Sequence, residues 1–206
     1  MTFRERVLTV NWGRKTWHLT GGLFAVAVAY FLPWPLPFLV AAGSFLLWVT
    51  IESMRRREPW FGRLFFSISA PFVRGFERRK LVGNTWLSLA VTIIAAIFHN
   101  PVLLAGSMIG WTFGDPAAEI FGKTIPSAKY FDGEKSIAGS IGCFVAAFLA
   151  YAGYFQIVGT GGDLLPAALT VATATTLAEA FSTSFTINDN FMIPLSSALA
   201  LSYILV

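Results

Sequence analysis

Ten residues near the middle of the chain, Gly114-Asp115-Pro116-Ala117-Ala118-Glu119-Ile120-Phe121-Gly122-Lys123, place two carboxylates and a lysine at the end of an apolar run. Asp115, Glu119 and Lys123 are spaced four apart, so on a helix they share one face. Pro116 has no N–H group and a fixed φ, which suits the first turn of a helix. The stretch therefore predicts a break at Gly114 and a new helix that begins at about Asp115.

A helix that begins at this point has the chemistry of a phosphate site. Its first N–H groups are free and its dipole presents a positive end. The carboxylates of Asp115 and Glu119 add ligands that suit Mg²⁺. The alternative is a buried ion pair between Glu119 and Lys123 that only stabilises the fold, but it leaves Asp115 unexplained. Ionisable groups inside a membrane are costly, so we favour a functional site.

The composition is that of an integral membrane protein. Of 206 residues, 55% are hydrophobic and 13% charged, with a mean hydropathy of +0.65, whereas a soluble domain carries about 25% charged residues. We expect an all-α, polytopic bundle that forms one domain over residues 1–206, without a cleaved signal peptide. Seven segments approach the roughly 20 residues that a bilayer requires. They are His18–Leu32, Leu36–Ile51, Leu81–Phe98, Pro101–Phe113, Ile137–Val158, Leu164–Phe181 and Phe191–Val206.

The distribution of charge predicts the orientation. All fifteen Lys and Arg residues precede the first segment or lie between the second and third or the fourth and fifth. The alternate loops, 33–35, 99–100 and 159–163, contain none. The positive-inside rule then places the N-terminus in the cytoplasm and the C-terminus outside, which agrees with an odd number of passes. A site built from the charged segments would face the cytoplasm.

The segment from Arg55 to Lys80 mixes basic and aromatic residues. Phe61, Phe65 and Phe72 have approximately helical spacing, which predicts an amphipathic helix in the membrane interface between the second and third spans. Anchoring to acidic headgroups is the favoured role. No nucleic-acid-binding fold accompanies these cations, so we expect no nucleic-acid partner.

A second polar group, Lys135-Ser136-Ile137-Ala138-Gly139-Ser140, opens the fifth span. Ser136 can cap the helix, and Lys135 can reach a phosphate as a point charge. Gly139 and Ser140 permit close approach of a neighbouring helix or of a ligand. The alternative is purely structural: a capping serine, a lysine at the interface and small residues for packing.

A third group lies where the sixth span ends and the seventh begins. Glu179 closes the sixth, and Asp189 and Asn190 open the seventh. Asp189 can simply cap its helix. It also enters the membrane on the same side as the first two groups, which makes a second metal ligand or a general base plausible.

Two further groups lie at the same face. Arg14, Lys15 and His18 precede or open the first span, and Glu52 and Arg55 close the second. Each can be structural, as a positively charged flank or as an ion pair within one helix. All five groups nevertheless meet at one membrane surface. Carboxylates for Mg²⁺, cations for phosphates and a lipid environment together indicate phosphoryl or nucleotidyl transfer onto a lipid.

In this order, these motifs resemble the CTP-dependent prenol and lipid kinases, which include dolichol kinase, phytol kinase and the yeast-type diacylglycerol kinase and are distantly related to phosphatidate cytidylyltransferases. Ala138 looks more like the phytol-kinase branch, since dolichol-kinase-like members usually carry glutamate there. The segments that carry the resemblance are Arg14–His18, Glu52 with Arg55, Gly114–Lys123, Lys135–Ser140, and Asp189-Asn190 before Pro194.

The resemblance implies a multi-pass membrane kinase that uses CTP, with Mg²⁺, to phosphorylate the hydroxyl of an isoprenoid alcohol or a diglyceride. By match, Asp115 binds metal and triphosphate, and Lys135 and Ser136 contact the nucleotide phosphates. Our hypothesis gives catalysis to Asp115, Asp189 and Lys135, with Asp189 accepting the hydroxyl proton. The metal set is Asp115, Glu119 and Asp189. The nucleotide set is Arg14, Lys15, Gly114, Lys123, Lys135, Ser136, Gly139 and Ser140. Further site candidates are His18, Glu52, Arg55, Glu179 and Asn190.

Two other functions stay open at this point. A cytidylyltransferase would make a CDP-lipid from a phosphatidic acid. An ion-coupled transporter would use its intramembrane carboxylates to carry protons or cations, but it should place them near the midplane. The sequence does not determine the alcohol, the choice between CTP and another nucleotide, or the oligomeric state.

Overall fold

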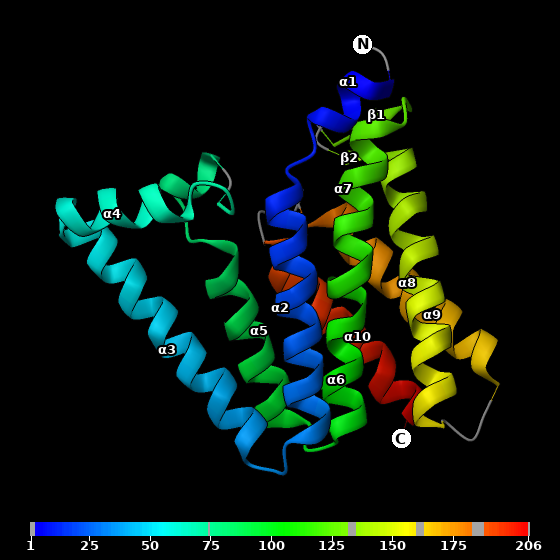
Figure 1. Ribbon diagram of the computed structural model, residues 1–206. Helices are drawn as coiled ribbons and strands as arrows, with labels where there is room; N and C mark the ends of the chain where they lie inside the picture. Colours follow the sequence, from blue (N-terminus) through cyan, green and yellow to red (C-terminus); the bar gives the residue numbers. More distant parts are fainter. Residues whose placement is uncertain (1–2, 74, 132–134, 160–162, 183–187, 206) are drawn as a thin grey trace.

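The computed structural model of the chain describes residues 3–73, 75–131, 135–159, 163–182 and 188–205 (Figure 1). The described residues form a helical bundle with one short two-stranded hairpin. Its elements are α1 (Phe3–Leu8), α2 (Trp12–Phe31), α3 (Leu36–Arg57), α4 (Pro59–Ser69), η1 (Gly75–Arg78), α5 (Gly83–Ile97), α6 (Pro101–Ile109), η2 (Gly110–Gly114), α7 (Asp115–Thr124), β1 (Lys129–Tyr130), β2 (Lys135–Ser136), α8 (Ile137–Val158), α9 (Leu164–Phe181) and α10 (Asp189–Leu205).

Local sequence sets several helix ends. The side chains of Asn11, Asn100 and Ser136 each accept a backbone N–H bond at the start of α2, α6 and α8, which satisfies donors that the first turn leaves unpaired. Gly159 ends α8 in the left-handed conformation at φ 69°, which glycine adopts without steric cost. These caps place the polar turns at the ends of apolar helices.

The predicted break at Gly114 is wrong. Gly114 has helical dihedral angles, φ −70° and ψ −49°, and so has Asp115. The π-helical segment η2 joins α6 to α7, and Figure 1 shows one continuous rod. Pro116 cannot donate a hydrogen bond, and a π segment absorbs that defect by changing the hydrogen-bonding register without ending the helix. The helix therefore has no free N-terminus at Asp115. The predicted phosphate site, which depended on free N–H groups at such an N-terminus, is not formed.

A stripe of glycines lets this rod lie at the centre of the bundle. Added Cβ atoms at Gly106, Gly110 and Gly114 would approach α8, α9 or α10 side chains within 2.4–3.1 Å. Gly122 continues the stripe and meets Gly139 of α8, with its own added Cβ 3.6 Å from the Gly139 Cα. Small residues at four-residue spacing allow helix backbones to approach closely in a membrane. The spacing of these glycines is visible in the sequence and could have predicted the central position of the rod.

Gly110→Ala should destabilise the protein by about 1–3 kcal/mol, because overpacking a tight site forces neighbours to move. The added Cβ would lie 2.4 Å from Thr175 Oγ1 and 2.9 Å from the Tyr151 hydroxyl. Gly153→Ala is the matched control, since nothing lies within 4 Å of its Cβ position. Thermal unfolding in detergent should show a lower Tm for the first variant and an unchanged or higher Tm for the second. Equal Tm values would contradict the packing argument.

The all-α prediction is confirmed apart from the antiparallel pair β1–β2, in which Lys129 lies opposite Ser136 and Tyr130 opposite Lys135. Each of the seven predicted apolar segments is largely helical. Within the described residues, the helices α3, α8 and α9 are long and apolar enough to cross a membrane. The count of seven passes stays a prediction, because helices such as α5 and α10 are shorter than these three.

The segment after α3 forms the helix α4, which lies across the end of α3 (Figure 1). Trp60, Leu64 and Ile68 of α4 are exposed along one side. The amphipathic helix is thus present, and its position in a membrane interface stays a prediction. The described cations lie on α1, at the start of α2, at the end of α3, on α4, on η1 and the turn after it, at the end of α7 and on β1 and β2. These parts lie at one end of the bundle (Figure 1). The cations that the sequence separates from the alternate loops therefore also lie together in the structure. That this end of the bundle faces the cytoplasm stays a prediction.

Candidate active site

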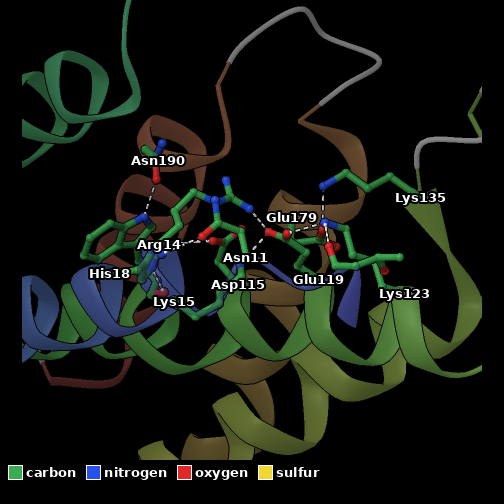
Figure 2. A network of polar contacts seen from close by, with 12 residues as sticks. Asn11, Arg14, Lys15, His18, Asp115, Glu119, Lys123, Lys135, Glu179 and Asn190 are labelled. Carbon is green, nitrogen blue, oxygen red and sulfur yellow. Dashed lines mark hydrogen bonds and ion pairs between the residues drawn. The ribbon is translucent and has the colours of Figure 1, made fainter. Parts of the chain in front are cut away.

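Glu119 of α7 lies among three cations at the charged end of the bundle (Figure 2). It pairs with Arg14 of α2, its Oε2 lies 2.5 Å from Lys15 Nζ, and its Oε1 lies 2.7 Å from Lys123 Nζ. These four side chains, the cation group, carry a net charge of +2. Because its oxygens are engaged by cations, Glu119 fits the ion-pair interpretation better than the predicted role as a metal ligand.

Lys135 of β2 is surrounded by carboxylates. Its Nζ pairs with Glu179 of α9, and Asp189 and Asp115 act on it electrostatically. Burial disfavours the charged form, but the three carboxylates outweigh it and raise the pKa of Lys135 above its usual value. Lys135 therefore stays protonated at neutral pH. Lys135 and these three carboxylates form the acidic group, which carries a net charge of −2.

The side chain of His18, on α2, contacts Trp111 of the π-helical segment η2. Its ring stacks on Trp111 with centroids 3.8 Å apart, and its Nε2 lies 2.8 Å from the Trp111 carbonyl oxygen. A carbonyl only accepts, so Nε2 carries the hydrogen, and Nδ1 faces Asp115 Oδ2 at 3.5 Å. Trp111 Nε1 donates to Asn190 Oδ1 of α10 at 2.6 Å. One chain of contacts thus fixes the orientation of His18 between Asp115 and Asn190 (Figure 2).

A divalent cation has a partial ligand set in the acidic group. In the described part of the chain, no three His, Cys, Asp or Glu side chains lie close enough to hold a metal by themselves. Mg²⁺ is commonly held by one or two carboxylates, with phosphate oxygens and water completing the shell. Asp115 and Asp189 are buried and both act on Lys135 and on His18. This pair fits a Mg²⁺ ion that arrives with phosphate.

The small residues of the second predicted group serve helix packing. Ser136 Oγ accepts from the Gly139 N–H at 3.2 Å, as a helix cap does. Gly139 is buried against α7, where an added Cβ would lie 2.9 Å from the Ala118 carbonyl oxygen. Ser140 bonds the Tyr130 hydroxyl and so ties α8 to the hairpin. The structure therefore favours the structural interpretation for these three residues, and Lys135 is the member of the group that faces the carboxylates.

Glu52 and Arg55 form a separate buried ion pair at the end of α3. Arg55 Nε donates to Glu52 Oε2 at 2.8 Å, and Glu52 Oε1 accepts from the Val82 N–H at 2.7 Å. Arg55 also donates to the Lys80 carbonyl at 2.5 Å and to the Arg78 carbonyl at 3.3 Å. These bonds hold the segment after η1 against α3, so the pair positions the start of α5.

A cavity of about 340 Å³ adjoins the charged end and is lined by α2, α3, α4, α5 and α6. Most of its wall is apolar. Arg14, His18, Trp111 and Asn190 line it as well as belonging to the polar contacts described above. The cavity and the charged groups therefore share a boundary. Trp111 was missed by the sequence reasoning, because an indole in an apolar run carries no sign of a polar contact.

Fold and site together define a helical membrane protein with paired acidic and basic groups beside an apolar cavity. Comparison with curated proteins then relates the chain to lipid kinases. It is 32% identical over 136 residues to a chloroplastic farnesol kinase of Arabidopsis thaliana, 27% identical over 209 residues to a probable chloroplastic phytol kinase of Triticum aestivum, and 26% identical over 160 residues to a CTP-dependent diacylglycerol kinase of Schizosaccharomyces pombe. The matches cover 61%, 95% and 75% of this chain.

The resemblance to CTP-dependent prenol and lipid kinases is thereby confirmed. The chain spans 44% of the length of the farnesol kinase, 68% of the phytol kinase and 71% of the diacylglycerol kinase. No protein-family model matches the chain, and no solved structure does.

Proposed function

We propose that the protein is a membrane kinase that transfers the γ-phosphate of CTP, or of another nucleoside triphosphate, to the hydroxyl of a lipid alcohol, with an isoprenoid alcohol as the favoured acceptor. The observation that carries the proposal is the arrangement of charge. A group of net charge +2 and a group of net charge −2 lie at one end of the bundle, and Arg14 of the first group and His18, which faces Asp115 of the second, line an apolar cavity. The names of the related kinases support the same reaction.

The two charged groups suit the two parts of a metal–nucleotide complex. Arg14, Lys15 and Lys123 attract the triphosphate and neutralise its charge. Asp115 and Asp189 would hold a Mg²⁺ ion, which would supply neutralising charge to the triphosphate. Lys135 adds a positive charge among these carboxylates, where it can contact a phosphate. Phosphoryl transfer depends mainly on positioning and charge stabilisation, so these few held side chains suffice.

His18 is the side chain that we propose accepts the proton of the acceptor hydroxyl. It lines the cavity and its Nδ1 faces Asp115, whereas Asp189, the candidate from sequence, is not among the described residues that line the cavity. The bond from Nε2 to the Trp111 carbonyl fixes the ring so that Nδ1 points toward the carboxylate. Because His18 lines the cavity and also faces Asp115, it lies between the cavity and the acidic group.

His18→Gln should lower kcat for lipid phosphorylation by about 100-fold while leaving nucleotide binding nearly unchanged, because positioned general bases contribute at least that much. His99→Gln is the matched control. His99 is the other histidine of the chain, is exposed, and stacks on Trp34 in the turn between α5 and α6. Steady-state kinetics with saturating CTP would measure both variants. Equal kcat values for the two variants would remove His18 from the mechanism.

The proposed reaction is tested with CTP labelled at either the α- or the γ-phosphate, using purified protein in detergent with Mg²⁺ and extracted lipids. We expect the γ-label in the lipid phase. Label from the α-phosphate would instead identify a cytidylyltransferase. If neither label moves with prenol or diglyceride acceptors and several nucleotides, the kinase proposal fails, and ion transport becomes the function to test.

A further inference from the structure

We infer that Pro116 is a positioning residue for His18. Together with the π-helical segment η2 it leaves the Trp111 carbonyl without a backbone donor, and His18 binds this carbonyl in the tautomer that keeps the lone pair on Nδ1. Gly22 completes the arrangement, because it lets α2 approach η2 closely enough for the contact. The effect of the arrangement on phosphate transfer rests on the proposed kinase function. The arrangement itself rests on the contacts of the protein alone.

The carbonyl of Trp111 lies within η2 and is buried. In a π turn, a carbonyl accepts from the N–H group five residues later, in place of the four of an α-helix. Five residues after Trp111 is Pro116, which has no N–H group. The N–H of Asp115, which would be the α-helical partner, pairs in the π register with the carbonyl of Gly110. The Trp111 carbonyl therefore has no donor within its own helix, and a buried carbonyl without a donor costs free energy.

His18 supplies the missing donor from the neighbouring helix. Its Nε2 lies 2.8 Å from the Trp111 oxygen, whereas its Nδ1 lies 3.5 Å from Asp115 Oδ2 (Figure 2). A neutral imidazole has one N–H group, so the two acceptors compete for it. A carboxylate is ordinarily the stronger acceptor of the two. The need of the Trp111 carbonyl for a donor therefore decides the competition and leaves Nδ1 as the nitrogen that accepts.

Gly22 allows α2 to reach the π-helical segment. It follows His18 by four residues, on the same face of α2, and is buried. A Cβ atom added to Gly22 would lie 2.3–2.9 Å from side-chain atoms of Thr112, the residue after Trp111. The His18 ring stacks on the Trp111 indole with centroids 3.8 Å apart. A side chain in place of Gly22 would therefore move α2 away from η2 and lengthen the bond from His18 to the carbonyl.

The alternative is that Pro116 serves helix geometry alone. Inside a continuous helix a proline is less favourable than alanine, because it lacks a donor and its ring crowds the preceding turn. If geometry were its only role, Pro116→Ala would give a protein that is at least as stable and equally active. A positioning role predicts a different combination, in which the variant is at least as stable but less active.

Pro116→Ala supplies the missing N–H group. Whether residues 110–114 keep the π register or return to the α register, the Trp111 carbonyl then has a backbone donor, at residue 116 or at residue 115. We expect the hydrogen of His18 to move to Nδ1, where Asp115 accepts it. Pro166→Ala is the matched control. Pro166 is exposed in the first turn of α9, where N–H groups have no acceptor within the helix.

Nitrogen NMR of the full chain in detergent, labelled with ¹⁵N at histidine, measures the tautomer directly. The chain has two histidines, so a His99→Gln background leaves the signals of His18 alone. At alkaline pH an imidazole is neutral, and the chemical shifts show which ring nitrogen carries the hydrogen. We expect hydrogen on Nε2 in the parent and in Pro166→Ala. In Pro116→Ala we expect at least about a tenfold excess of the tautomer with hydrogen on Nδ1, because a bond to a carboxylate is the stronger one.

Gly22→Ala provides a second, independent variant for the same measurement. The clash with Thr112 should weaken the bond from His18 to the carbonyl and so reduce the excess of the tautomer with hydrogen on Nε2. Gly21→Ala is its matched control, because nothing lies within 4 Å of that Cβ position. It should keep the spectrum of the parent.

Kinetic measurements then connect the tautomer to the proposed reaction. An Nδ1 that already carries hydrogen has no lone pair to accept the proton of the acceptor hydroxyl. Pro116→Ala should therefore lower kcat with γ-labelled CTP and a prenol by about 10- to 100-fold, approaching His18→Gln, with an unchanged KM for CTP. In a His18→Gln background, Pro116→Ala should have no further effect, because it acts through His18. Pro166→Ala should keep the kcat of the parent.

Four results would overturn the inference and leave the kinase proposal standing. They are hydrogen on Nδ1 already in the parent, an unchanged tautomer in Pro116→Ala, a changed tautomer with an unchanged kcat, and an equal loss of kcat when Pro116→Ala is made in the His18→Gln background. The NMR measurement needs no substrate, so it is separate from the labelled-CTP test. The expected change of tautomer without phosphate transfer to any alcohol would sustain the arrangement of Pro116 and His18 and reject the kinase function.

Discussion

Asp115→Asn is expected to reduce phosphate transfer by about 1,000-fold while the protein remains folded. Asp115 is buried, faces His18 Nδ1 at 3.5 Å, and acts electrostatically on Lys135. The amide keeps the shape of the side chain but removes the negative charge that we propose holds a Mg²⁺–phosphate complex, and losing one preorganised charge-stabilising group typically costs about 100- to 1,000-fold. Initial rates with γ-labelled CTP and a prenol acceptor would measure the loss.

Asp163→Asn is the control for this substitution. Asp163 is an exposed aspartate just before α9, at the end of that helix opposite Glu179. The same change of carboxylate to amide there should leave the rate unchanged, and both variants should keep the wild-type Tm and elution volume in detergent. Near-normal turnover of Asp115→Asn would show that the metal role assigned to Asp115 is wrong.

Lys135→Met is expected to lower both stability and activity, and a second substitution separates the two effects. Lys135 pairs with Glu179, and both side chains are mostly buried. Removing one partner of a buried ion pair leaves the other charge uncompensated, at a cost of up to about 3–5 kcal/mol. Lys135→Met should therefore lower the Tm and reduce phosphate transfer by about 1,000-fold, because it also removes a positive charge from the proposed phosphate site.

The double variant Lys135→Met with Glu179→Gln removes both charges and should recover most of the lost stability, since no unpaired charge then remains buried. Phosphate transfer should stay as low as in the single variant. Thermal unfolding and labelled-CTP rates on the wild type, the two single variants and the double variant complete the cycle. Recovery of activity together with stability would show that Lys135 acts only through its pair with Glu179.

The positions of the helices were predictable from the sequence, because they depend on local properties. Apolar runs bounded by Pro, Gly and capping residues predicted the helical segments that the structure contains, and the charge pattern predicted that the polar groups meet at one end. The error at Gly114 has a local cause as well. Pro116 is typical of the first turn of a helix and so predicted a helix start, but a π-helical segment accommodates it inside a continuous helix.

The partners of the polar side chains were decided by tertiary structure. Glu119 and Asp115 lie on one face of the same helix, yet Glu119 faces the cations of α2 and α7 while Asp115 faces His18. Spacing along one helix cannot distinguish these outcomes, because both carboxylates face α2 and each outcome depends on which α2 side chain lies opposite.

The same holds for the contacts between distant segments. Lys135 and Glu179 are 44 residues apart, and Trp111 and Asn190 are 79 apart. The cavity is likewise lined by residues of α2, α3, α4, α5 and α6, so it depends on how these helices pack. The sequence by itself determined a membrane helix bundle with its charges at one end, since hydropathy and charge are local. The packing of the helices decided which carboxylate faces which cation and where the apolar cavity lies, since those contacts join residues far apart in the chain.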